Sequence, residues 1–196
     1  MARNEEYYRR YESLCSEVGH AYYAAQILEA LKEVENIDFD EEDPRYLIVL
    51  YFCEIAKQDL AMTVWRVFFD SSVHANTVHS LKKYLFQKGI VIQERFRLSQ
   101  EVAIINTDVC TIRKKYIAHT DANRGAVSIS VELLRKALDE IIAMVNLLCY
   151  KSVDERVEPV SDEIRTFISE QALSGFRSII KDYVTQSLGD DDHAGH

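Results

Sequence analysis

The sequence has little of the material that forms tight turns, and no long apolar run. It contains only two prolines and six glycines in 196 residues, which favours long helices over frequent turns. Its densest apolar run, residues 46–53, ends at Glu54, well short of the roughly 20 apolar residues that a membrane span needs. The first ten residues, MARNEEYYRR, lack the apolar core of a secretory signal. We therefore expect a cytoplasmic protein with no membrane partner.

The sequence also lacks a cysteine pair and an overall positive charge. The cysteines form no C-x-x-C motif, and each lies within an apolar helical pattern, at Cys15, Cys53, Cys110 and Cys149. We interpret them as small core residues that stay reduced. The net charge of −9 argues against a protein that binds nucleic acid over its whole surface, because such binding needs many contacts between cations and phosphates. Any site for a polyanion must be local.

What the sequence does contain is helical periodicity. Apolar residues make up 47% and charged residues 28% of the chain, a globular composition, and the apolar residues recur at spacings of three and four. Helix starts are indicated by Asp43-Pro44, Ser99 and either Ser128 or Ser130, and Gly89 indicates a stop. The expected helices cover residues 4–36, 43–69, 77–88 and 99–119, a stretch from 128 or 130 to 150, and a stretch that begins at 161, with residues 90–98 extended or irregular.

These elements predict an all-α fold, an up-and-down helical bundle with an additional C-terminal helix. We assign residues 1–152 to the bundle and residues 153–188 to a charged linker and the C-terminal helix. The polar residues 189–196 are expected to be a disordered tail.

One segment, Arg113 to Asp121 with the sequence RKKYIAHTD, carries residues suited to chemistry. A histidine can move a proton near neutral pH, and a guanidinium can hold two phosphoryl oxygens while negative charge develops on them. Arg113 and His119 could thus cleave RNA without a metal, with the RNA's own 2′-hydroxyl as nucleophile and His119 as general acid or base. Residues that could hold the RNA backbone or orient the histidine are Lys114, Lys115, Thr120, Asp121, Asn123 and Arg124.

Arg113 and His119 need not meet within one subunit. Six positions along an α-helix are about 9 Å of rise and about 600° of rotation, which separates the two side chains around the helix axis. Two copies packed across a two-fold axis would bring two arginines and two histidines into one cleft.

The spacing of Arg113 and His119 resembles the R-x(4–6)-H signature of the HEPN superfamily, and the closing Ala-His-Thr-Asp is most similar to its AbiU-type abortive-infection branch. The resemblance implies a homodimeric, metal-independent ribonuclease without a cofactor, in phage defence or a toxin-like role. It implies RNA as a partner, and an antitoxin or other regulatory protein as a possible one. Lys114 stands where the superfamily usually has Asn, Asp or His. Asp121 stands where toxins with a nucleotidyltransferase antitoxin have a tyrosine, so that type of antitoxin is not expected.

The same residues also fit a protein without catalysis. Cations in the last turn of a helix are favoured by the helix dipole alone, and the alternative is therefore a non-catalytic HEPN-like module for dimerisation, sensing or immunity.

Other candidate sites have simpler interpretations. Glu17 and His20 have the spacing of a di-iron ligand pair but lack a second copy, so a solvent-facing pair is expected. His74 and His79 lack zinc-ligand partners. The early tyrosines are interpreted as part of a packing seam, at Tyr7, Tyr8 and Tyr11.

Overall fold

The computed structural model describes residues 4–35, 44–72, 74–113, 129–171, 174, 175 and 178. Within these ranges every regular element is a helix, which confirms the predicted all-α bundle. The elements are α1 (Glu5–Glu35), α2 (Pro44–Val64), the π-helix η1 (Trp65–Phe69), α3 (Val78–Gln87), α4 (Gln100–Ala103), α5 (Ile105–Ile112) and α6 (Val131–Leu147). A further helical stretch covers residues 162–171. No helix in the described ranges combines the length and the apolar character needed to cross a bilayer.

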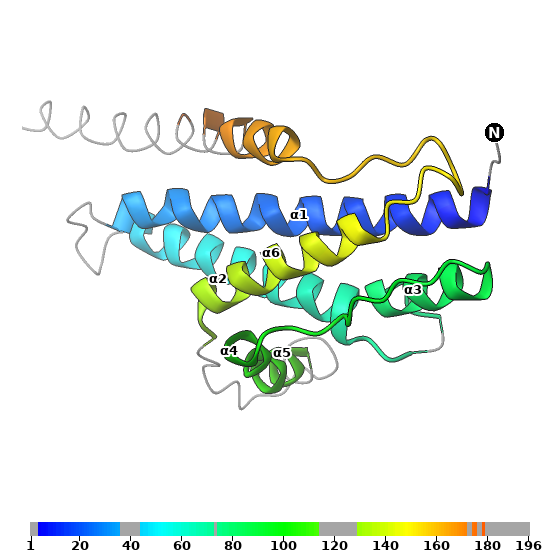
Figure 1. Ribbon diagram of the computed structural model, residues 1–196. Coiled ribbons are helices and arrows are strands. Elements are labelled where there is room, and N and C mark those ends of the chain that lie inside the picture. The colour runs from blue at the N-terminus through cyan, green and yellow to red at the C-terminus, as the bar shows by residue number, and fades with distance from the viewer. Residues whose placement is uncertain are drawn as a thin grey trace, which may run out of the picture.

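The long helix α1 packs against most of the other helices of the bundle. Its N-terminus is capped by Asn4, whose Oδ1 accepts a hydrogen bond of 3.1 Å from the backbone N–H of Tyr7. Its apolar stripe is fully buried, as the three-and-four spacing predicts, and the first members are Tyr7, Tyr11, Leu14 and Val18. α1 packs along α2 and α6 (Figure 1), so this stripe forms the centre of the hydrophobic core.

α2 begins at Pro44, as Asp43-Pro44 predicts, and ends in a π-helical turn. The turn closes with the backbone N–H of Asp70 donating to the carbonyl of Trp65 over 2.9 Å. A π-turn places more residues in each turn than an α-helix does, so it changes which side chains face the core. Val67 is buried here, while Trp65 is only partly buried and lies beside α5.

α3 has clear signals at both ends. Thr77 and Ser80 form a reciprocal capping box at its start. Gly89 ends it with φ +83°, a left-handed conformation that glycine adopts without strain, and the N–H of Ile90 returns to the carbonyl of Leu85 over 3.0 Å. The predicted stop is therefore confirmed. The connector that follows has no regular structure but buries Ile92, Phe96 and Leu98 in the core.

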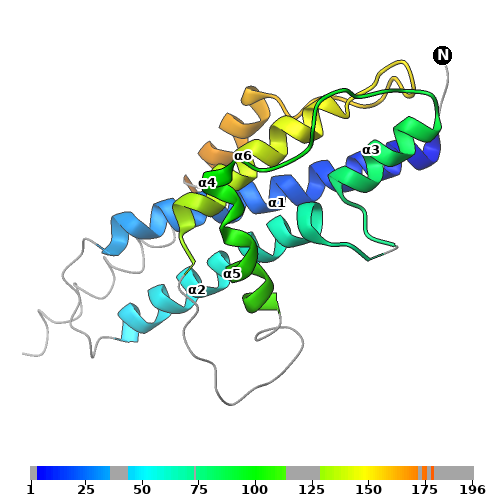
Figure 2. The same ribbon diagram turned by 60° about the horizontal axis from the view of Figure 1, so that its bottom comes forward.

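This connector determines the direction in which the later helices run. It carries the chain back along α3 to the short helices α4 and α5, and α5 then crosses α2 (Figure 2). As a result α6 runs in the same direction as α2 and opposite to α1 (Figure 1). Of the two serines considered for its start, Ser130 is the cap, since its Oγ accepts a hydrogen bond of 3.2 Å from the N–H of Leu133.

The segment after α6, which the sequence predicts to be a charged linker, packs tightly onto the start of α1. The Asp154 side chain is fully buried, and its Oδ2 accepts a hydrogen bond of 2.9 Å from the backbone N–H of Asn4. Arg156 binds the same carboxylate over 2.8 Å and also Glu5 over 3.0 Å. The Tyr7 hydroxyl donates to the carbonyl of Leu148 and accepts from the backbone of residue 150. These contacts hold the two distant parts of the chain together.

Candidate functional site

The best-defined part of the predicted site is Arg113. It is the C-cap residue of α5, directly after the buried side chains of Val109 and Ile112. The guanidinium carbon lies 4.2 Å from the centroid of the Trp65 ring in η1, well within the range of a cation–π contact. Trp65 thus supports one face of the guanidinium, while the side chain stays exposed to solvent.

The electrostatics of Arg113 suit an anionic ligand. No carboxylate among the described residues forms an ion pair with Arg113. A guanidinium without a carboxylate partner keeps its five N–H donors available for phosphate oxygens.

The remaining predicted site residues lie outside the described residues. They are Lys114, Lys115, His119, Thr120, Asp121, Asn123 and Arg124. The structure therefore places Arg113 of the proposed catalytic pair and does not test its relation to His119.

Trp65 was not among the residues singled out from the sequence. It is the only tryptophan in the chain, and it lies within the long apolar pattern of residues 43–69, where it is indistinguishable from a core residue. Its partner Arg113 is on another helix. Only the packing of α5 against η1 brings the two together.

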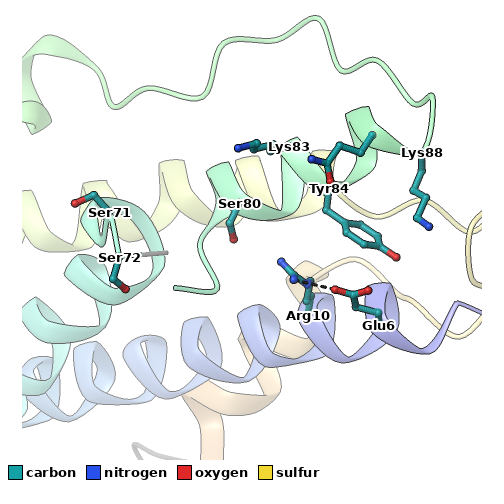
Figure 3. A pocket seen from close by; sticks show the side chains of 9 residues that line it. Glu6, Arg10, Ser71, Ser72, Ser80, Lys83, Tyr84 and Lys88 are labelled. Atoms are coloured by element: carbon teal, nitrogen blue, oxygen red, sulfur yellow. Dashed lines mark hydrogen bonds and ion pairs between the residues drawn. The ribbon is translucent and has the colours of Figure 1, made fainter. Parts of the chain in front are cut away.

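A second basic region lies at the other end of η1. A polar cleft of about 680 Å³ is formed by α1, α3 and the turn that follows η1. Figure 3 shows Arg10 on α1 and Tyr84 on α3 facing one another across it, with Ser71 and Ser72 at the far end. The guanidinium carbon of Arg10 and the Nζ of Lys88 lie 5.3 Å and 5.5 Å from the centroid of the Tyr84 ring.

A charge count could have found this region in the sequence. Residues 77–98 contain five cations, Lys82, Lys83, Lys88, Arg95 and Arg97, against the single carboxylate Glu94, for a local charge of five minus one, or +4. The chain as a whole carries −9. The signal is easily missed because these cations are spread over a helix and an irregular segment and form no run.

The first half of α2 carries exposed apolar side chains. Val49 and Ala56 face the core, but the other sides of the helix present Leu47, Ile48, Leu50, Tyr51, Phe52 and Ile55, with exposed fractions from 37% to 65%. A contiguous apolar surface of this kind marks an interaction site more often than a free surface.

The histidine and carboxylate candidates for metal sites form no cluster. Glu17 pairs with Arg66 over 2.9 Å instead of with a metal ligand. His79 packs against Phe68 and Phe96, with ring centroids 4.8 Å and 6.5 Å away, and desolvation lowers its pKa. No group of three His, Cys, Asp or Glu side chains suited to a metal ion exists within the described part of the chain.

The cysteines and early tyrosines behave as structural residues. All four cysteines are half-buried and form no disulfide, and burial raises the pKa of the Cys15 thiol to about 11. A thiol with so high a pKa is a poor nucleophile at neutral pH. Tyr7 and Tyr11 lie in the core with ring centroids 6.1 Å apart, as the seam interpretation predicts.

No family description, no curated protein and no solved structure matches the chain. What the fold and the site define is the class, an all-α bundle protein. Within the described residues, it presents the exposed Arg113 at the end of α5 and a cleft with three cations along α1 and α3.

Proposed function

We propose that the protein is a metal-independent endoribonuclease of the HEPN type, active as a homodimer and acting in phage defence or in a toxin-like role. The observation that supports the proposal most directly is the environment of the Arg113 side chain. Its guanidinium is exposed, rests on the Trp65 ring at 4.2 Å and has no carboxylate partner among the residues described. An arginine held this way costs little reorganisation when it binds a phosphate.

Arg113 supplies charge stabilisation in the proposed reaction. When the 2′-hydroxyl attacks the adjacent phosphorus, negative charge develops on the non-bridging oxygens, and the planar guanidinium binds two of them in a bidentate fork. Cleavage then leaves a 2′,3′-cyclic phosphate and a 5′-hydroxyl. The cyclic product forms because the nucleophile belongs to the RNA itself, and this chemistry requires neither metal nor cofactor.

His119 supplies the proton transfers. As a neutral imidazole it accepts the proton of the 2′-hydroxyl, or as an imidazolium it donates a proton to the leaving 5′-oxygen. Its partner arginine comes from the second subunit in the proposed dimer, because the helix that the sequence predicts through residue 119 would hold Arg113 and His119 of one chain apart.

The exposed apolar surface of α2 supports association with a second copy. Six half-exposed side chains of this size present on the order of 500 Å² of apolar surface. A stable interface buries roughly 800 Å² on each partner, so these side chains can form most of its centre. They are Leu47, Ile48, Leu50, Tyr51, Phe52 and Ile55.

The experiment that tests the activity is an incubation of the pure protein with tRNA and total RNA in EDTA, followed by analysis of the new RNA ends. Wild type is compared with Arg113→Ala, Arg113→Lys and His119→Ala. Arg9→Ala is the matched control, because Arg9 is an exposed arginine on α1 that pairs with Glu5 over 3.3 Å and does not line the cleft. We expect Arg113→Ala and His119→Ala to slow cleavage by about 10²-fold to 10⁴-fold. Arg113→Lys also slows cleavage, since lysine keeps the charge but loses the fork.

The same apolar surface favours the second candidate, a non-catalytic dimerisation, sensor or immunity module. The two functions separate in this experiment. Wild-type protein that dimerises but leaves every RNA intact in EDTA, with folded variants that behave alike, would establish the module and exclude the nuclease.

A further inference from the structure

We propose that the polar cleft between α1, α3 and the turn after η1 is an RNA-backbone site that holds phosphates of the substrate next to the Arg113 site. The inference rests on the proposed function, because it assigns to the cleft a part of the same substrate. The cleft has a volume of about 680 Å³, within the range of sites that bind small molecules or a few nucleotides.

The charge of the cleft is positive in an acidic protein. Its lining includes three cations, Arg10, Lys83 and Lys88, and a single carboxylate, Glu6, which gives three minus one, or +2. Glu6 is bound to Arg10 over 2.9 Å, so it orients the guanidinium and neutralises only part of the charge. Lys83 is exposed and forms no ion pair with any described residue.

The lining favours phosphate over a base. Ser71 and Ser72 contribute hydroxyl donors, which phosphate oxygens accept readily. The Ser80 hydroxyl already donates to the carbonyl of Thr77 over 2.9 Å. Tyr84 could stack on a base, but the residue is only 9% exposed and two cations lie near the centroid of its ring. Its hydroxyl is also engaged, donating to Asn4 Oδ1 over 2.9 Å. Recognition in this cleft is therefore of the backbone and independent of base sequence.

The position of the cleft connects it to Arg113. η1 runs from Trp65, whose ring contacts the Arg113 guanidinium, to Phe69. Ser71 and Ser72 of the cleft follow shortly after Phe69 in the chain. One short element thus separates the two phosphate-binding groups, and a single-stranded RNA can reach both. The surplus of cations over residues 77–98 continues the basic surface along α3, and Phe86, 64% exposed on that helix, offers a stacking surface outside the cleft.

The experiment measures binding separately from cleavage. Full-length protein with His119→Ala is titrated in EDTA into a fluorescein-labelled 20-nucleotide single-stranded RNA at several salt concentrations. In this background Lys83→Ala, Lys88→Ala and the double variant are compared with Lys151→Ala. Lys151 is an exposed lysine outside the cleft, paired with Glu158 over 2.6 Å. All variants are checked for unchanged thermal unfolding.

We expect each cleft variant to bind about threefold to tenfold more weakly than the parent, and the double variant at least tenfold more weakly. The slope of log K against log salt should become shallower by about 0.7 for each phosphate that the variant no longer binds. Lys151→Ala should bind within twofold of the parent. If the cleft variants bind as tightly as Lys151→Ala and with the same slope, the proposal is overturned.

Two further outcomes are informative. One distinguishes RNA binding in the cleft from nuclease activity, and the other distinguishes RNA from a free polyphosphate as the ligand of the cleft. Wild type that leaves RNA intact in EDTA, combined with weaker binding by the cleft variants, refutes the nuclease and supports the cleft as an RNA site. Calorimetry with sodium tripolyphosphate forms a separate arm. Tripolyphosphate binding that depends on Lys83 and Lys88, with RNA binding unaffected by either, would assign the cleft to a free polyphosphate and overturn the RNA proposal.

Discussion

Arg113 lies over the Trp65 ring, with the guanidinium carbon 4.2 Å from the centroid of the indole. This contact joins the π-helical end of α2 to the end of α5. Because Trp65 is the only tryptophan in the chain, its fluorescence reports on the environment of the proposed catalytic arginine.

Arg113→Ala should therefore change the tryptophan emission spectrum of the folded protein, since it removes a cation from the face of the ring. Titration with single-stranded RNA should change the emission of the His119→Ala protein and have a smaller effect on Arg113→Ala. Arg9→Ala, at an exposed arginine that pairs with Glu5 on α1, should have the spectrum of wild type. Identical spectra for wild type and Arg113→Ala would show that the contact does not form in solution.

The Asp154 carboxylate should make the free energy of unfolding depend on pH in the acidic range. Hydrogen bonds from the Arg156 side chain, followed by those from the Arg156 and Asn4 backbones, hold the pKa of Asp154 well below its usual range. A lowered pKa in the folded state stabilises the protein above the pKa of the unfolded chain, about 3.9, and this contribution is lost as the pH falls below that value.

Asp154→Asn should thus lower Tm at pH 7, by about 5 °C or more, and the difference from wild type should shrink below about pH 4. Asp162→Asn is the control, because Asp162 is exposed and its ion-pair partner among the described residues is its helix neighbour Arg165. Thermal melts followed by circular dichroism from pH 7 to pH 3 measure both. A difference in Tm that stays constant over this range would contradict the assignment.

The apolar surface of α2 should determine the oligomeric state. Tyr51→Ser removes a side chain that is 65% exposed in the single chain, and we expect it to weaken dimerisation about tenfold to a hundredfold. Phe86→Ser, at a site of 64% exposure on α3, should leave dimerisation unchanged. Sedimentation velocity over a concentration series distinguishes the two. Equal effects of both substitutions, or a wild-type monomer at micromolar concentration, would refute the proposed interface.

Local signals in the sequence predicted most of the helix ends. Pro44, Gly89 and Ser130 act on their nearest neighbours along the chain, so their effects can be read from a few residues. The buried stripe of α1 follows from its spacing alone. These features needed no knowledge of tertiary contacts.

Contacts between distant segments could not be predicted in this way. The charged stretch after α6 has the composition of a linker, and only the proximity of Asn4 shows that Asp154 is a buried anchor. The pairing of Trp65 with Arg113 depends on how α5 crosses η1. The cleft likewise needs Arg10 and Lys83 to meet from two helices.

The most direct test of the central claim is cleavage of RNA in EDTA by a mixture of Arg113→Ala and His119→Ala proteins, dissociated and reassociated together. If Arg113 of one subunit acts with His119 of the other, half of the dimers formed are mixed and each contains one complete site, so the mixture should recover about a quarter of the wild-type rate. Each variant treated alone should stay inactive. A mixture no more active than its components, beside an active wild type, would contradict a site shared between subunits, and an inactive wild type would contradict the nuclease itself.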